Sequence, residues 1–109
     1  MYKGTLDFDD GDIIEVHSLI LREQEIAFDL TATWGEHGRW KRSGIAAKGS
    51  LGFASDFQPS QHAQTGVTGY PCQLIFHVTN VTSRALLITG SWNEANEPHA
   101  FRGSLAGKS

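Results

Sequence analysis

Hydrophobic and polar residues alternate along most of this chain, which is the pattern of β-strands that bury one face. The clearest run spans residues 26–34, where every even-numbered residue from Ile26 to Trp34 is apolar. Weaker versions of the same alternation occur at 2–8, 14–20, 74–78, 88–92 and 101–105. No stripe at helical spacing extends beyond one turn, so the pattern predicts an all-β protein.

Two regions interrupt this alternation. Glycines at 44, 49 and 52 break the segments 40–47 and 49–53, which are predicted to be two strands that bend sharply. Residues from about 54 to 71 are predicted to form a long loop, and loops of that length are usually functional. We therefore expect a single domain, 1–109, with about eight strands.

The two ends of the chain carry similar strand motifs. Tyr2-x-Gly4-x-Leu6 and Phe101-x-Gly103-x-Leu105 each place an aromatic residue, a glycine and an aliphatic residue on one face. This likeness predicts that the first and last strands pair and close the sheet, which removes its edges. The fold class is thus a small antiparallel up-and-down barrel or a barrel-like sandwich.

Two short motifs extend this interpretation to a known architecture. Through Gly90-Ser91-Trp92 and Phe101-x-Gly103-x-Leu105, the chain resembles the up-and-down barrels of the avidin and lipocalin type, and this resemblance implies a calycin-like fold. The resemblance implies the barrel and no particular ligand, because no set of residues reproduces a biotin or retinoid site.

Composition narrows the class of protein. The single cysteine, Cys72, excludes an internal disulfide framework, and no signal-like apolar run follows Met1, which favours the cytoplasm. No apolar run approaches the roughly 18 residues of a membrane span. A net charge of −3 argues against nucleic acid, so Arg39, Lys41 and Arg42 are interpreted as a solvated strand face around Trp40.

The order of the strands predicts where a site lies. In a meander, alternate turns share an end, so the turns after the first, third, fifth and seventh strands lie together. The predicted ligand-binding residues at this end are Trp34, Glu36, His37, Trp40, His62, Tyr70, Trp92, Glu94 and His99, with Glu97 nearby. If residues 39–53 form one long strand instead of two, the long loop lies opposite the Glu94 turn.

Trp34 and Trp92 are expected to be buried on the inner face.

Other chemistry finds little support in the sequence. The Asp-rich segment 7–12 resembles the start of a calcium loop, but its twelfth position is Ser18 where a glutamate is required. The histidines lack a fixed metal-ligand spacing, and Ser50 lacks the context of a nucleophile elbow. We therefore predict no metal, no cofactor and no catalytic residue.

Three classes of function remain open. The first is a non-catalytic binding protein whose interior or open end receives a small apolar or aromatic molecule. The second is a protein-binding module, such as an inhibitor or an immunity-type partner, and the third is a small barrel enzyme that uses histidine and glutamate at the open end. An apolar strip on the outer faces, which includes Leu19, Leu21, Ile75 and Leu87, suggests homo-oligomers.

Overall fold

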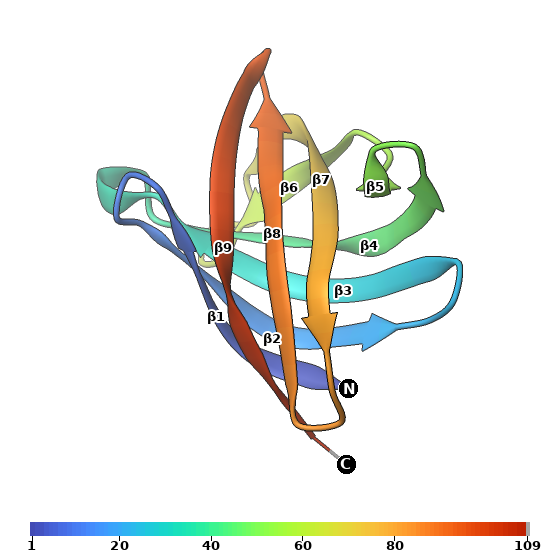
Figure 1. Ribbon diagram of the computed structural model, residues 1–109. Coiled ribbons are helices and arrows are strands. Elements are labelled where there is room, and N and C mark those ends of the chain that lie inside the picture. The colour runs from blue at the N-terminus through green and yellow to red at the C-terminus, as the bar shows by residue number, and fades with distance from the viewer. Residues whose placement is uncertain (109) are drawn as a thin grey trace.

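The computed structural model describes residues 1–108 as one antiparallel sheet that curls into a barrel (Figure 1). Within these residues, a short 3-10 helix, η1 (Gly35–His37), is the one helical element among strands and turns. The strands are β1 (Tyr2–Phe8), β2 (Ile13–Leu21), β3 (Glu25–Thr33), β4 (Arg39–Gly49), β5 (Gly52–Ser55), β6 (Gln58–His62), β7 (Thr68–Val81), β8 (Ala85–Glu94) and β9 (Glu97–Gly107). Among residues 1–108, no helix has the length and apolar character to cross a membrane.

Two pairings close the sheet into a ring. β1 runs antiparallel to β9, from Tyr2 opposite Gly107 to Phe8 opposite Phe101. On the other side β3 pairs with β4 along its whole length. The prediction that the first and last strands are neighbours is confirmed, and so is the all-β class: eight strands form a closed antiparallel barrel and β6 is an additional strand.

β6 occupies the segment that the sequence suggested was a loop. It follows β5 in the same position of the ring, since both strands pair with β4 on one side and with β7 on the other. The expectation of a long structureless stretch at 54–71 is therefore wrong: β5 ends at Ser55, β6 covers 58–62 and β7 begins at Thr68. The polar composition of this segment hid its strands.

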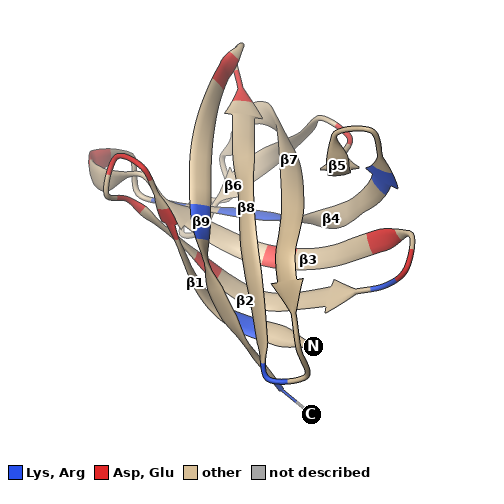
Figure 2. Cartoon of the chain, in the orientation of Figure 1, with Lys and Arg blue, Asp and Glu red and all other residues tan. Residues whose placement is uncertain are grey.

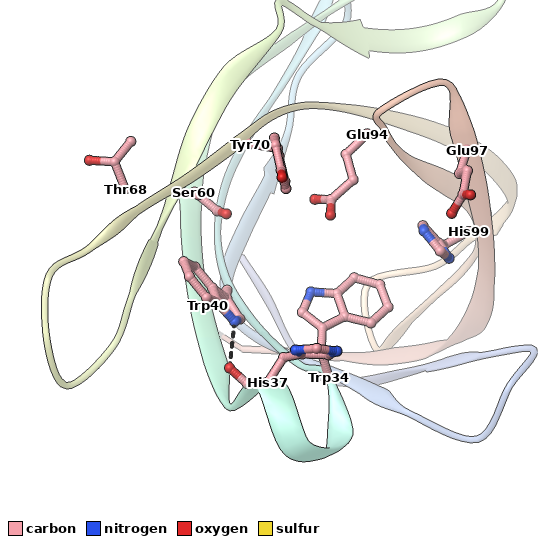
Figure 3. Close-up of a pocket in the computed structure, with 10 residues that line it drawn as sticks. Trp34, His37, Trp40, Ser60, Thr68, Tyr70, Glu94, Glu97 and His99 are labelled. Carbon is pink, nitrogen blue, oxygen red and sulfur yellow. Dashed lines mark hydrogen bonds between the residues drawn. The ribbon is translucent and has the colours of Figure 1, made fainter.

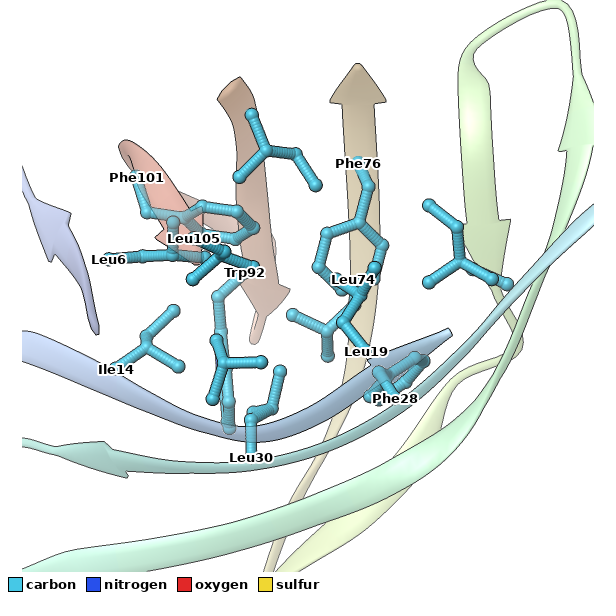
Figure 4. Close-up of a cluster of buried hydrophobic side chains, with 14 of the residues drawn as sticks. Leu6, Ile14, Leu19, Phe28, Leu30, Leu74, Phe76, Trp92, Phe101 and Leu105 are labelled. Atoms are coloured by element: carbon cyan, nitrogen blue, oxygen red, sulfur yellow. The ribbon is translucent and has the colours of Figure 1, made fainter. Parts of the chain in front are cut away.

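The barrel interior is packed with alternating apolar side chains (Figure 4). The even-numbered residues of β3 from Ile26 to Ala32 are buried, as the sequence predicted. Phe28, Phe76 and Phe101 form a chain of ring contacts across the interior, with centroid separations of 5.3 and 5.8 Å. Most of the barrel is therefore a solid core, which leaves its ends as the places where a ligand could enter.

A β-bulge in β2 reverses the faces of that strand. The register between β2 and β3 shifts between Val16 and Ser18, and an extra residue at such a point turns all later side chains to the opposite face. Leu19 is consequently fully buried and Leu21 packs against the core, while Ile20 is 38% exposed. Alternation alone placed these residues on the wrong faces.

The bulge also changes the outer apolar strip. The expectation that Leu19 and Leu21 belong to it is wrong, because both contribute to the interior. Ile75 on β7 is half-buried and Leu87 on β8 is 42% exposed, so these two keep their predicted outward positions. What remains of the strip is confined to β7 and β8.

A charged side chain lies inside the barrel on β4. Arg42 is 4% exposed, because it shares the inner face of the strand with Trp40, two residues away. The interpretation of Arg39, Lys41 and Arg42 as one solvated face is therefore wrong for Arg42, whereas its two basic neighbours are exposed. Basic composition around Trp40 concealed the period-two pattern.

The Arg42 guanidinium fills a gap in the barrel wall. β6 pairs with β4 at Trp40 and Lys41, and β5 pairs with β4 only from Ala46 onward, so the intervening backbone of β4 lacks ladder partners on that side. Nη2 of Arg42 donates to the carbonyl oxygens of Asp56 at 2.9 Å and of Cys72 at 3.2 Å. It also reaches the hydroxyl of Ser55 at 3.3 Å, and Nη1 donates to the carbonyl of Ser43. Arg42 thus joins β4, β5 and β7 where the backbone ladder is broken.

Candidate functional site

Four connections meet at one end of the barrel, which we call the mouth. They are residues 9–12, 34–38, 63–67 and 95–96. β5 and β6 run in the same direction, so the two strands together count as one strand of the meander. Alternate turns therefore lie at the same end, as predicted for a meander of eight strands. His37 and His99 line one cavity, and the His62 ring lies 5.0 Å from that of Trp40 at the same end. The predicted shared end is confirmed.

The mouth opens into a cavity of about 610 Å³ (Figure 3). That volume lies within the range of pockets that hold small molecules. The cavity is bounded by the β3–β4 connection with η1 on one side, by β4, β6 and β7 on another, and by the β8–β9 hairpin. Its lining residues are Trp34, His37, Trp40, Ser60, Thr68, Gly69, Tyr70, Glu94, Glu97 and His99.

Aromatic rings form much of the cavity wall. The ring of Trp34 packs 4.3 Å from that of Phe8 and 5.6 Å from that of Trp92, measured between centroids. Trp40 is held by a 2.9 Å hydrogen bond from its Nε1 to the carbonyl oxygen of His37. Tyr70 is 70% exposed, so its ring is the least constrained of the wall.

Gly69 allows β7 to approach Trp40 closely. A Cβ atom at this position would lie 2.7 Å from the Ser60 hydroxyl and 3.1 Å from the Trp40 ring. Any larger residue would displace one of these side chains, because real Cβ atoms do not come so close. Gly69 therefore fixes the shape of the cavity on the β6–β7 side.

Two carboxylates, from Glu94 on β8 and Glu97 on β9, line the β8–β9 side of the cavity. In Figure 3 the Glu94 side chain is directed toward the centre of the cavity, and Glu97 lies beside His99. One oxygen of Glu94 accepts a 2.9 Å hydrogen bond from Nε1 of Trp92, which orients the carboxylate. Within residues 1–108 the salt bridges are Arg22–Glu25 and Arg39–Glu15, so neither cavity carboxylate is neutralised by a basic side chain.

A buried layer lies directly beneath the cavity. Trp92 is fully buried two residues inward from Glu94, and Cys72, which pairs with Glu94 across β7 and β8, is also buried. Arg42 occupies the corresponding position on β4, two residues inward from Trp40. This layer separates the cavity from the apolar core.

Cys72 is held in its neutral form by this layer. Burial raises the pKa of the Cys72 thiol to about 11, and the neighbouring Arg42 guanidinium only partly offsets the shift. Because thiolates and not thiols react, Cys72 is unsuited to nucleophilic chemistry. Since the folded pKa lies above the unfolded value of 9.0, burial of the thiol stabilises the fold fully below pH 9. That contribution is lost as the pH rises from 9 toward 11.

Native protein should accordingly resist thiol labelling. With Ellman's reagent at pH 8, we expect Cys72 to react at least about 100-fold more slowly in the folded protein than in denaturant. The denatured protein is the control for reagent and thiol count. Rapid stoichiometric labelling of the native protein would contradict the burial and the raised pKa described for this thiol.

The structure brings most of the predicted site residues together, but not all. Trp34, His37, Trp40, Tyr70, Glu94 and His99 line the cavity. Glu36 is exposed on η1, His62 lies behind Trp40, and Trp92 is buried beneath the cavity. Trp34, expected to be buried, lies on the inner face but is partly exposed because it forms the cavity wall.

Sequence reasoning missed three cavity residues, Ser60, Thr68 and Gly69. All three lie in the stretch that was taken for a loop. Tyr70 continues the inner-face alternation of Cys72, Leu74 and Phe76, but the register between β6 and β7 shifts before Thr68, so the alternation does not extend to Gly69 and Thr68. Period two therefore gives no signal for Thr68 and Gly69, because the bulge interrupts it.

Fold and site together define a closed antiparallel β-barrel with a mixed aromatic and acidic cavity at one end. Comparison of the chain with protein-family models, with curated proteins and with solved structures finds no match. Within residues 1–108, no group of three or more histidine, cysteine or acidic residues is arranged to hold a metal ion. The assignment of function therefore rests on the cavity itself.

Proposed function

We propose that this protein is a non-catalytic binding protein that receives a small aromatic molecule in the cavity at the mouth of its barrel. The observation that carries the proposal is the cavity of about 610 Å³, walled by the rings of Trp34, Trp40 and Tyr70. Aromatic walls with a few placed polar groups are typical of small-molecule sites. Flat rings offer large contact areas and favourable stacking geometry to an aromatic ligand.

The rigidity of the cavity supports this proposal. Trp34 is packed against Phe8 and Trp92, and Trp40 is fixed by its hydrogen bond to the His37 carbonyl. Little side-chain freedom is therefore lost when a ligand is bound, which favours affinity. A closed barrel wall around a solid core supplies the stable frame for such a site.

A matched pair of variants tests the proposal. We expect small aromatic compounds to quench or shift tryptophan fluorescence in the wild-type protein, and Trp40→Leu to weaken their binding by about 10-fold, because it removes a ring from the wall. Phe57→Leu is the control, since Phe57 is an exposed ring outside the cavity. Equal effects of the two substitutions, or no binding by the wild type, would contradict the proposed function.

A protein-binding module is the second candidate. It is favoured by large apolar side chains exposed near the β4–β7 side of the barrel, namely Leu51, Phe57 and Val67. Native mass spectrometry of protein purified from cells distinguishes the two: a retained mass of a few hundred daltons favours the ligand barrel, and a bound chain favours the module. The same spectrum gives the oligomeric state and so tests whether the chain self-associates. A cytoplasmic location and a calycin-like relationship remain predictions from sequence.

A further inference from the structure

The charges around the cavity point to the class of ligand, an inference that rests on the function proposed above. We propose that the ligand is a small organic cation: an aromatic or otherwise apolar body that carries an amine. The aromatic wall would accept the body, and the carboxylates of Glu94 and Glu97 would accept the ammonium group.

The first argument is the balance of charge in the cavity lining. Glu94 and Glu97 line the cavity, and neither lysine nor arginine does. Glu94 uses one oxygen for the Trp92 indole and keeps the other available on the cavity side. The nearest arginine on the inner face, Arg42, is committed to carbonyl oxygens at the β5–β6 break and lies in the layer below. A cation entering here meets two unneutralised acceptors.

The second argument is the nature of the rings. Tryptophan and tyrosine faces attract cations through the ring quadrupole, and tryptophan does so most strongly. Trp34 and Trp40 lie across the cavity from Glu94, and Tyr70 stands beside Glu94. Two rings that face Glu94 across the cavity, with a third ring beside it, match the aromatic body and the ammonium group of an aromatic amine.

The third argument is the charge distribution over the whole mouth. Figure 2 shows acidic residues at the β1–β2 turn, on η1 and at the β8–β9 tip, as well as at the β2–β3 turn, while basic residues lie along β4 and β9, at the β7–β8 turn and at the C-terminal end. The connections 9–12, 34–38, 63–67 and 95–96 contain no lysine or arginine. The acidic residues at the mouth are Asp9, Asp10, Asp12, Glu36, Glu94 and Glu97. Such a field attracts cations and repels anions.

Three probes of nearly identical shape separate charge from shape. These are 3-phenylpropan-1-amine, 3-phenylpropan-1-ol and 3-phenylpropanoate, which are cationic, neutral and anionic near pH 7. We expect the amine to bind at least about 10-fold more tightly than the alcohol, and the carboxylate to bind most weakly. Raising the salt concentration from about 0.05 to 0.5 M should weaken amine binding several-fold and leave alcohol binding nearly unchanged.

Two variants assign the preference to the cavity carboxylates. Glu97→Gln and Glu94→Gln should each reduce the amine-to-alcohol ratio several-fold, and the glutamine at 94 can still accept the Trp92 hydrogen bond. Glu97 is exposed, so its substitution leaves the fold intact even if position 94 does not tolerate change. Glu23→Gln, in the exposed β2–β3 turn away from the cavity, is the control and should leave the ratio unchanged.

The outcomes separate this inference from the function on which it rests. Alcohol binding as tight as amine binding, or a ratio unchanged by both cavity variants, would overturn the cation while leaving a ligand-binding barrel. Failure of all three probes to bind at millimolar concentrations would count against the binding function, and the cation would fall with it. A clear amine preference that Glu97→Gln reduces and Glu23→Gln does not would support both.

Discussion

Replacing Trp92 with alanine is expected to lower the free energy of unfolding by about 3–5 kcal/mol. Trp92 is fully buried, and its ring lies beneath the cavity in edge contact with Trp34. Alanine would leave a large void that the surrounding barrel strands cannot fill, because pairing on both sides fixes their positions. Denaturant titration measures the change through the shift of the midpoint at constant slope.

Trp40→Ala is the matched comparison. Trp40 has the same side chain and also faces inward, but it stands partly exposed in the cavity wall. Its loss should cost less than about 2 kcal/mol, because little of the vacated volume is enclosed. A cost below about 1 kcal/mol for Trp92→Ala, or a larger cost for Trp40→Ala, would mean that the buried layer has been wrongly described.

Arg42→Met is expected to destabilise the fold by about 1–3 kcal/mol. The substitution keeps an unbranched apolar stem but removes the donor to the carbonyl oxygen of Cys72, whereas the carbonyl oxygen of Asp56 still accepts from the Ser55 hydroxyl. Each buried acceptor left without a partner costs roughly 1–3 kcal/mol. Removal of the desolvated charge offsets part of this loss. Because the gap between β4 and β5 then has no bridging side chain, we expect the acceptor term to dominate.

Lys41→Met is the control for this effect. It lies next to Arg42 on the same strand, but its side chain is on the exposed outer face. The same chemical change should shift stability by less than about 0.5 kcal/mol there. If Arg42→Met leaves the free energy of unfolding unchanged or raises it, then burying the charge costs at least as much free energy as its hydrogen bonds contribute.

Most of the fold could be predicted because the sequence itself displays the alternation of the strands and the likeness of the first and last strands, and because each strand of a meander reverses the chain direction. β3 shows each inward residue in the sequence itself, and the likeness of the two chain ends predicted the β1–β9 pairing. Once eight positions in a meander are assumed, the parity of the turns places His37 and His99 at one end without further information. These features depend on local periodicity and chain topology, which a single sequence displays.

The remaining features arise from interactions that local periodicity does not encode. The bulge after Val16 moved Leu19 from the predicted surface into the core. No residue type in the sequence marks the position of this bulge, so alternation counted through it assigns the later residues to the wrong face. The inward position of Arg42 depends on carbonyls freed by the break between β5 and β6, far along the chain. Ser60 and Thr68 were missed because polar strand residues that line a cavity look like loop residues.

The measurement that tests the proposed binding site most directly is a nitrogen-15 NMR titration of the protein with 3-phenylpropan-1-amine. The three tryptophan indole signals report on separate positions: Trp34 and Trp40 in the cavity wall and Trp92 in the layer below. We predict saturable shifts of the Trp34 and Trp40 indoles and of the Tyr70 and Glu94 amides, with signals from the opposite turns at 22–24 and 82–84 unchanged. Shifts centred on the outer faces of β7 and β8, or no saturable shift at the mouth, would contradict a ligand site in this cavity.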